Sequence, residues 1–111
     1  MQSAKAQVKC MKAIIRRDAN ATETILTDDN KMCAIGGLAH YGARVSLSTM
    51  RRWVKAGDGT TVAWGVVVSR FPILAGCRAS EVFNINDSYN NHDLHRRRVA
   101  LCAFFDSLLD E

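Results

Sequence analysis

Proline is nearly absent from this sequence, glycine is sparse, and no long hydrophobic run occurs. The 111 residues include one proline and seven glycines, which excludes a collagen-like chain and argues against extended disorder. The longest uncharged apolar run covers residues 62–69, whereas a membrane-spanning helix needs about 20 apolar residues. We therefore expect a globular protein without a membrane span.

Secretory and metal-binding signatures are also missing. The N-terminal stretch is interrupted by Lys9 and Lys12, so it lacks the continuous apolar segment of a secretory signal, and the expected localisation is cytoplasmic. The absence of a Cys-x-x-Cys pair argues against a zinc site and a redox dithiol. We expect no cofactor and no metal. Each cysteine is interpreted as a small, reduced core residue: Cys10, Cys33, Cys77 and Cys102.

The composition is that of one folded domain. Apolar residues make up 48% and charged residues 23% of the chain, both near the globular average. This length is a common domain size, so residues 1–111 are interpreted as a single domain. Ten of the fifteen basic residues are arginine and the net charge is +4. That balance favours an acidic partner, but it is also what ordinary solubility requires.

Helical patterns occupy four segments. Residues 2–17 carry one amphipathic stripe, and the small residues of 32–42 predict a short, buried, tightly packed helix. Ser46 or Ser48 would cap a third helix, which Gly57 would end. The last helix is expected over residues 93–109. Three arginines lie mostly off its apolar side: Arg96, Arg97 and Arg98.

Two segments have the features of short strands. Residues 22–27 are rich in β-branched side chains and lead into a polar cluster at residues 27–30, which predicts a strand and a turn. Residues 81–85 alternate as a strand would, and the turn-forming Asn86-Asp87-Ser88 would end it. Residues 60–71 fit a strand by their valine content and a helix by the spacing of Trp64, Val67 and Phe71.

Two short motifs resemble those of a family of small uncharacterised bacterial and phage domains. They are Cys33-Ala34-Ile35-Gly36-Gly37-Leu38 and, before the closing amphipathic helix, Ile85-Asn86-Asp87. Members of that family have a Cys-Ala-Leu-Gly-Ala-Leu type helix and an apolar-Asn-Asp turn before the last helix. This chain differs in having Gly37 where alanine is usual and Ile85 where tryptophan is frequent.

The resemblance implies a fold more than a function. It implies that residues 60–71 form a helix ending at Pro72 and that residues 24–27 pair with residues 82–85. The expected fold is therefore α+β and predominantly α, with about five helices packed around one core and at most a small two-stranded β ribbon. The family has no established activity.

Cys33 is the candidate nucleophile of a Cys–His thiol hydrolase. If it opens a helix, the helix dipole would favour its thiolate, with His92 as base and Asp87 as the orienting carboxylate, or with His40 or His95 as the base. The alternative is a buried structural cysteine, because Cys33 stands among apolar residues. No motif specific to cysteine hydrolases is present. His92 and His95 are spaced so that both could bind one metal ion, but no second ligand pair accompanies them.

Basic clusters suggest a second candidate function, nucleic-acid binding, if they converge on one face. No helix-turn-helix signature, zinc finger or aromatic stacking motif accompanies them. The clusters are Arg16-Arg17, then Arg51 and Arg52 with Trp53 and Lys55, and then residues 95–98.

Protein binding is the function that we favour. Exposed arginine together with Trp53, Tyr41 or Tyr89 is typical of interfaces. By analogy with phage-borne proteins, the chain would be a non-enzymatic accessory protein of a phage or mobile element that binds and modulates a host protein. The expected binding residues are Arg51, Arg52, Trp53, Lys55, Arg96, Arg97 and Arg98.

Overall fold

The computed structural model describes residues 2–17, 25–89 and 93–110, and every regular element in these ranges is helical. The π-helix η1 (Leu38–Gly42) continues α2, and the 3-10 helices η2 (Pro72–Leu74) and η3 (Leu108–Asp110) follow α4 and α6. The α-helices of the described residues are α1 (Ala4–Arg17), α2 (Ala34–Gly37), α3 (Leu47–Ala56), α4 (Gly59–Arg70), α5 (Ala79–Asp87) and α6 (Leu94–Ser107).

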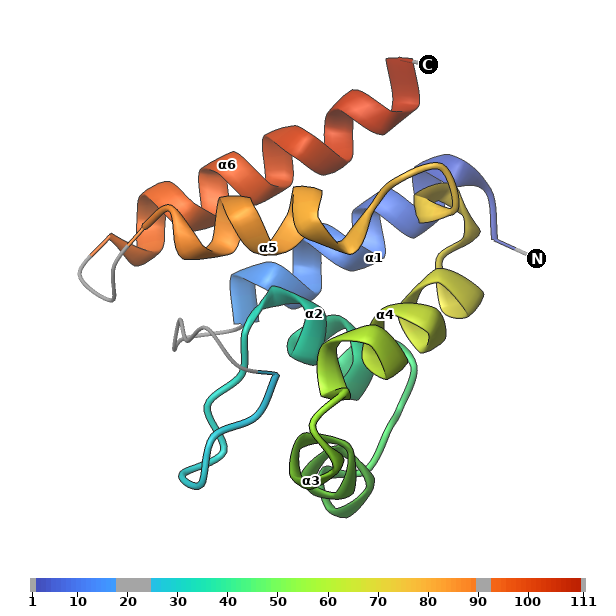
Figure 1. The fold of residues 1–111 in the computed structure, drawn as a ribbon. Helices are drawn as coiled ribbons and strands as arrows, with labels where there is room; N and C mark the ends of the chain where they lie inside the picture. The colour runs from blue at the N-terminus through green and yellow to red at the C-terminus, as the bar shows by residue number, and fades with distance from the viewer. Residues whose placement is uncertain (1, 18–24, 90–92, 111) are drawn as a thin grey trace.

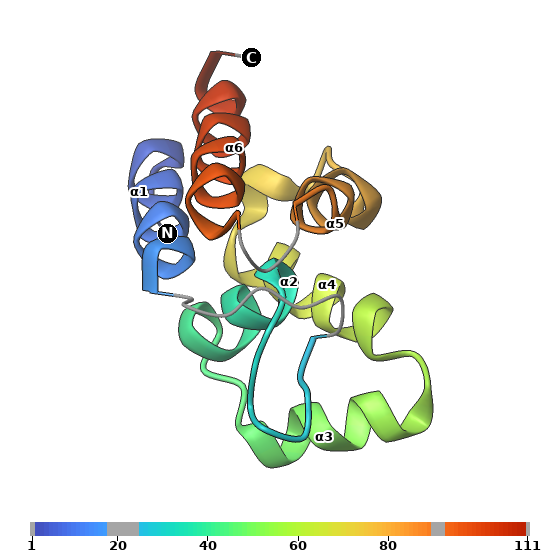
Figure 2. The same cartoon turned by 90° about the vertical axis from the view of Figure 1, so that its left-hand side faces the viewer.

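The short α2–η1 segment lies at the centre of the molecule. It contacts α1, α4 and α5, while α1 packs along α6 and α3 packs mainly against α4. Figures 1 and 2 show α1, α5 and α6 at one end and α3 at the other, and α1 and α6 run side by side in opposite directions. The radius of gyration is 12.8 Å, close to the roughly 13 Å expected of a compact chain of this length.

Helical periodicity explains how α1 enters the core. Val8, Met11 and Ile15 recur every three or four residues and are all at most 2% exposed, because this spacing places them on one face of a helix. Burying each such side chain stabilises the fold by about 1.5–3 kcal/mol. Two phenylalanines, Phe71 after α4 and Phe105 on α6, are fully buried in the same core.

Helix ends in the middle of the chain follow local chemistry. The Ser46 hydroxyl accepts a hydrogen bond from the Thr49 N–H at 3.2 Å and so caps α3, and Gly57 ends α3 in the left-handed region at φ 90°. Helix α4 ends before Pro72. The expectations of helices here and over residues 60–71 are confirmed.

The expected β ribbon is wrong for the described residues. Residues 82–85 lie inside α5, residues 25–27 form no strand, and residues 18–24 lie outside the described ranges. Asn86 and Asp87 are the last residues of α5 and not a turn after a strand. An alternating pattern over five residues is too short to distinguish the two-residue period of a strand from the 3.6-residue period of a helix. As a helix, α5 buries Val82 and Asn86 on one face.

The polar turn after residue 27 is present. The Asn30 N–H donates to the Thr27 carbonyl at 3.0 Å, and the Thr27 N–H donates to the Lys31 carbonyl at 2.9 Å. Asn30 adopts φ 65°, a conformation that asparagine tolerates better than most residues.

The cysteines are core or near-core residues, as expected. Cys33 is buried and the other three are partly buried against the core. No disulfide joins the four, all of which lie in the described ranges. No helix in those ranges is long and apolar enough to cross a membrane.

Candidate functional site

Helices α1 and α6 pack side by side (Figure 2), and a groove runs along the line between them. It consists of two contiguous open hollows of about 530 Å³ each, which both include Lys12, Arg16 and Asp106. One hollow extends to Lys5 and Leu109, and the other extends to the beginning of α6. We call this surface the α1–α6 groove.

The wall formed by α1 is cationic along its whole length. It has no acidic residue, and four of its five basic side chains recur at positions i, i+4, i+7 and i+11, so these four lie on one face of the helix. They line the groove: Lys5, Lys9, Lys12 and Arg16. Eleven residues of helix span about 16 Å, so the cations form an extended stripe.

The wall formed by α6 mixes cations with apolar surface. His95 and Arg98 line its beginning. Val99 is 55% exposed and Leu109, in η3, is 39% exposed, and the exposed Ala103 lies between them in the chain. Contact between water and an apolar side chain such as Val99 is unfavourable. A protein surface that presents this side chain between cations is therefore suited to an amphipathic partner.

Asp106 is the acidic residue of the groove. Its carboxylate accepts from Lys12 Nζ at 3.1 Å, with the two side chains 52% and 25% exposed, and a pair this exposed contributes less than about 1 kcal/mol. Among the residues that the structure describes, Lys5, Lys9 and Arg16 form no ion pair. The groove is therefore strongly positive, with one partly neutralised lysine.

Cys102 lies at the floor of the same groove. Burial raises the pKa of its thiol, the cations of Arg16 and Lys12 oppose that rise, and Asp106 adds to it. The thiol is therefore held in its neutral form at physiological pH and adds apolar rather than charged character to the floor.

The basic clusters of the sequence do not share one face. Arg16 meets His95 and Arg98 in the α1–α6 groove, but Arg51, Arg52 and Lys55 are exposed on α3, at the opposite end of the molecule (Figure 1). Arg51 bonds to Asn30 and Arg52 donates to the Thr49 hydroxyl at 3.2 Å. Trp53 is half-buried and packs against the core. Arg96 lines an adjoining hollow with Tyr89, on the other side of Val99.

Arg97 corrects the expectation for the last helix. We expected it to lie off the apolar side with its neighbours, but it is fully buried. Its Nη1 donates to Asn86 Oδ1 at 2.6 Å, and the same oxygen accepts from the Ala34 N–H at 3.0 Å. Arg97 and Asn86 therefore connect α6, α5 and the beginning of α2, and Arg97 is a structural residue and not a surface one.

Cys33 does open a helix, as the thiol-hydrolase hypothesis requires, but it is only 4% exposed. Its sulfur accepts from the Gly36 N–H at 3.5 Å. The His40 ring bonds through Nδ1 to the Val45 carbonyl at 2.7 Å, and Asp87 accepts from Asn86. His92 lies outside the described residues. A substrate could reach the sulfur only if the core opened locally.

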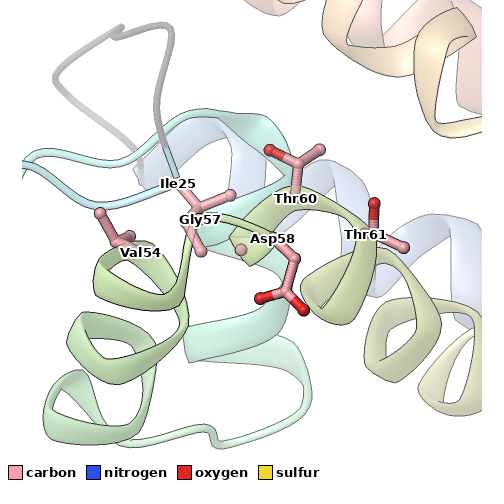
Figure 3. A pocket seen from close by; sticks show the side chains of 7 residues that line it. Ile25, Val54, Gly57, Asp58, Thr60 and Thr61 are labelled. Atoms are coloured by element: carbon pink, nitrogen blue, oxygen red, sulfur yellow. The ribbon is translucent and has the colours of Figure 1, made fainter.

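The turn between α3 and α4 forms a separate hollow of about 240 Å³. Figure 3 shows Val54, Asp58 and Thr60 around Gly57, and no cation lines it. The exposed positions of α4 are Thr60, Thr61, Gly65 and Ser69. The exposed positions of α4 thus carry no positive charge of the kind that DNA-reading helices present. Arg70, in the last turn of α4, is half-buried, and its Nε donates to the Gly42 carbonyl at 3.0 Å. No group of three or more potential metal ligands occurs in the part of the chain that the structure describes.

The sequence reasoning singled out Arg16 but missed Lys5, Lys9 and Lys12. Their spacing in the sequence was a sufficient signal, because the helical periodicity that buries Val8, Met11 and Ile15 also places Lys5, Lys9, Lys12 and Arg16 on one common face. The sequence did not indicate that this face lies beside α6.

Comparisons of the chain with protein-family models, with curated proteins and with solved structures gave no match.

Proposed function

We propose that this chain is a small non-enzymatic domain that binds another protein through the α1–α6 groove. The observation that carries the proposal is the combination of exposed Val99 and Leu109 with a stripe of cations on α1. These apolar side chains are removed from water only when a partner covers them. The charges around them determine which partner binds. The burial of Cys33 is in keeping with a function that needs no active site.

The family resemblance suggests the biological setting. In that setting the chain is an accessory protein of a phage or mobile element, and it modulates a host protein by occupying one of its surfaces. For this purpose the groove needs to exclude competing partners but does not need to position reacting groups, which agrees with an open surface lined by three lysines.

Nucleic-acid binding is the second candidate, favoured by the cationic stripe of α1. One feature supports a protein partner instead. A phosphate backbone offers no apolar surface to cover Val99, which is 55% exposed in the groove.

Affinity purification from a native-host extract tests the proposal. The bait is the wild-type chain, a Val99→Asp variant, or a Val54→Asp variant, whose substitution lies at a similarly exposed valine on α3. We expect quantitative mass spectrometry to find a protein that wild type and Val54→Asp retain and that Val99→Asp loses, while circular dichroism shows all three folded. Recovery of no protein that depends on Val99, or of nucleic acid alone, would overturn the proposal.

A further inference from the structure

We propose that the partner segment in the α1–α6 groove is an acidic amphipathic helix. The inference rests on the proposed function and adds the conformation, length and charge of the bound segment. Three observations support it: the shape of the groove, the spacing of its apolar side chains, and the placement of its charges.

The shape comes from the two helices that form the groove. Helices α1 and α6 lie side by side and antiparallel (Figures 1 and 2). Two adjacent cylinders leave a shallow trough that a third helix fills by packing its ridges between theirs. The cationic stripe from Lys5 to Arg16 is about 16 Å long, which corresponds to about three helical turns of a bound segment.

Apolar contacts would form near both ends of that trough. Val99 and Ala103 offer one apolar surface, and Leu109 offers a second. Val99 and Leu109 are ten positions apart, or about 15 Å along the helix axis. A bound helix would therefore place one large apolar side chain against Val99 and another, about three turns away, against Leu109, which is the pattern of apolar contacts in helix-in-groove recognition.

The charges of the groove specify the rest of the bound helix. Lys5, Lys9 and Arg16 border the trough on the α1 side, and Arg98 borders it on the α6 side. A segment with glutamate or aspartate on both sides of its apolar stripe places a carboxylate near each of these cations. Because Lys5, Lys9 and Arg16 form no ion pair among the described residues, pairing with these three cations breaks no existing ion pair there.

Among the described residues of the groove, Asp106 is the one that opposes an acidic helix. It would lie close to the bound segment because it lines both hollows, and it neutralises Lys12 through their ion pair. Replacing it with asparagine removes the repulsion and frees the Lys12 ammonium for the partner. The inference therefore predicts a gain of affinity on removing a charge, which a purely structural role of Asp106 does not predict.

Selection from a display library of random peptides of about 16 residues, enough for the three turns that the groove offers, tests the inference with the intact chain as target. We expect the selected peptides to be rich in aspartate and glutamate, with apolar residues at helical spacing. Fluorescence anisotropy with the labelled peptides then gives dissociation constants for the variants. Lys9→Glu/Arg16→Glu is expected to weaken binding at least about tenfold, and Asp106→Asn to strengthen it about two- to fivefold.

A matched charge reversal on α3, Arg52→Glu/Lys55→Glu, controls for net charge and is expected to leave the affinity unchanged. Selected peptides without an acidic excess, selection of none, or peptides that bind the α1 variant as tightly as wild type would overturn the inference. If neutral peptides were selected and Val99→Asp abolished their binding, the groove would still bind protein and only the acidic helix would be wrong. If no peptide were selected and labelled duplex DNA or RNA bound instead, the proposed function would fail as well.

Discussion

The buried guanidinium of Arg97 donates to the side-chain oxygen of Asn86, which also accepts the first backbone N–H of α2. One amide oxygen thus connects α2, α5 and α6. A buried positive charge is tolerated only when hydrogen bonds replace its hydration. The fold therefore depends on Asn86 Oδ1 as a hydrogen-bond acceptor for Arg97.

Asn86→Ala should be among the most destabilising single substitutions in the chain. It deprives both the Ala34 N–H and the Arg97 guanidinium of a buried acceptor, and we expect a loss of about 3 kcal/mol in the free energy of unfolding, measured by urea denaturation. The exposed neighbour Asn84 supplies the control, since Asn84→Ala should change stability by less than about 0.5 kcal/mol.

A double-mutant cycle separates the pair from its surroundings. Because Arg97→Met removes the charge that Asn86→Ala leaves without this acceptor, the double variant should be more stable than the sum of the single losses predicts, by about 1 kcal/mol. Strict additivity of the two losses would show that the hydrogen bond between Asn86 and Arg97 contributes nothing.

Two adjacent glycines in α2 should respond to alanine in opposite directions. A Cβ at Gly36 would lie 2.0 Å from the Ile25 carbonyl oxygen, whereas a Cβ at Gly37 would meet only the Ile14 side chain, at 3.9 Å. We expect Gly36→Ala to cost about 2 kcal/mol through overpacking against backbone. Gly37→Ala should stabilise by about 0.5–1 kcal/mol, because Gly37 already has helical angles. Thermal unfolding followed by circular dichroism measures both, and equal effects of the two substitutions would contradict the packing described.

Cys102 should be a slow thiol and a reporter of the groove. Burial raises its pKa, so its alkylation by iodoacetamide should increase with pH only above the range of an unfolded cysteine. Mass spectrometry of the Cys102 peptide gives the rate, and the same chain in guanidinium chloride is the control. Arg16→Ala should raise the pKa further, because it removes a cation that stabilises the thiolate. An alkylation midpoint below that of the unfolded chain would contradict this.

The polar turn after α1 should show a pH effect of known sign. A hydrogen bond from the Thr27 hydroxyl, 2.5 Å from the carboxylate oxygen, lowers the pKa of Asp29. A group whose folded pKa is lowered stabilises the fold above its unfolded pKa, and that stabilisation is lost as the pH falls through the folded pKa. Thr27→Val should therefore move the NMR titration of Asp29 to higher pH.

Much of the helical content was predictable from local pattern. The stripe of Val8, Met11 and Ile15 predicted α1, and Ser46 and Gly57 predicted the bounds of α3, because these signals arise within one or two turns. The family resemblance predicted the helix α4, whereas the valine content of residues 60–71 by itself favoured a strand. Residues 81–85 were misassigned as a strand because a pattern of five residues fits the period of either a strand or a helix, and contact with α2 and α6 decided the outcome.

The sequence by itself determined which face of α1 would be buried, since helical geometry follows from residue spacing. Only the tertiary structure decided that α1 and α6 lie together, so that Lys9, Arg16 and Val99 form one surface, and that Arg97 is buried while Arg98 lines the groove. The physical reason is that neighbours on α6 point in directions about 100° apart, and only the packing of other helices determines which direction is the interior.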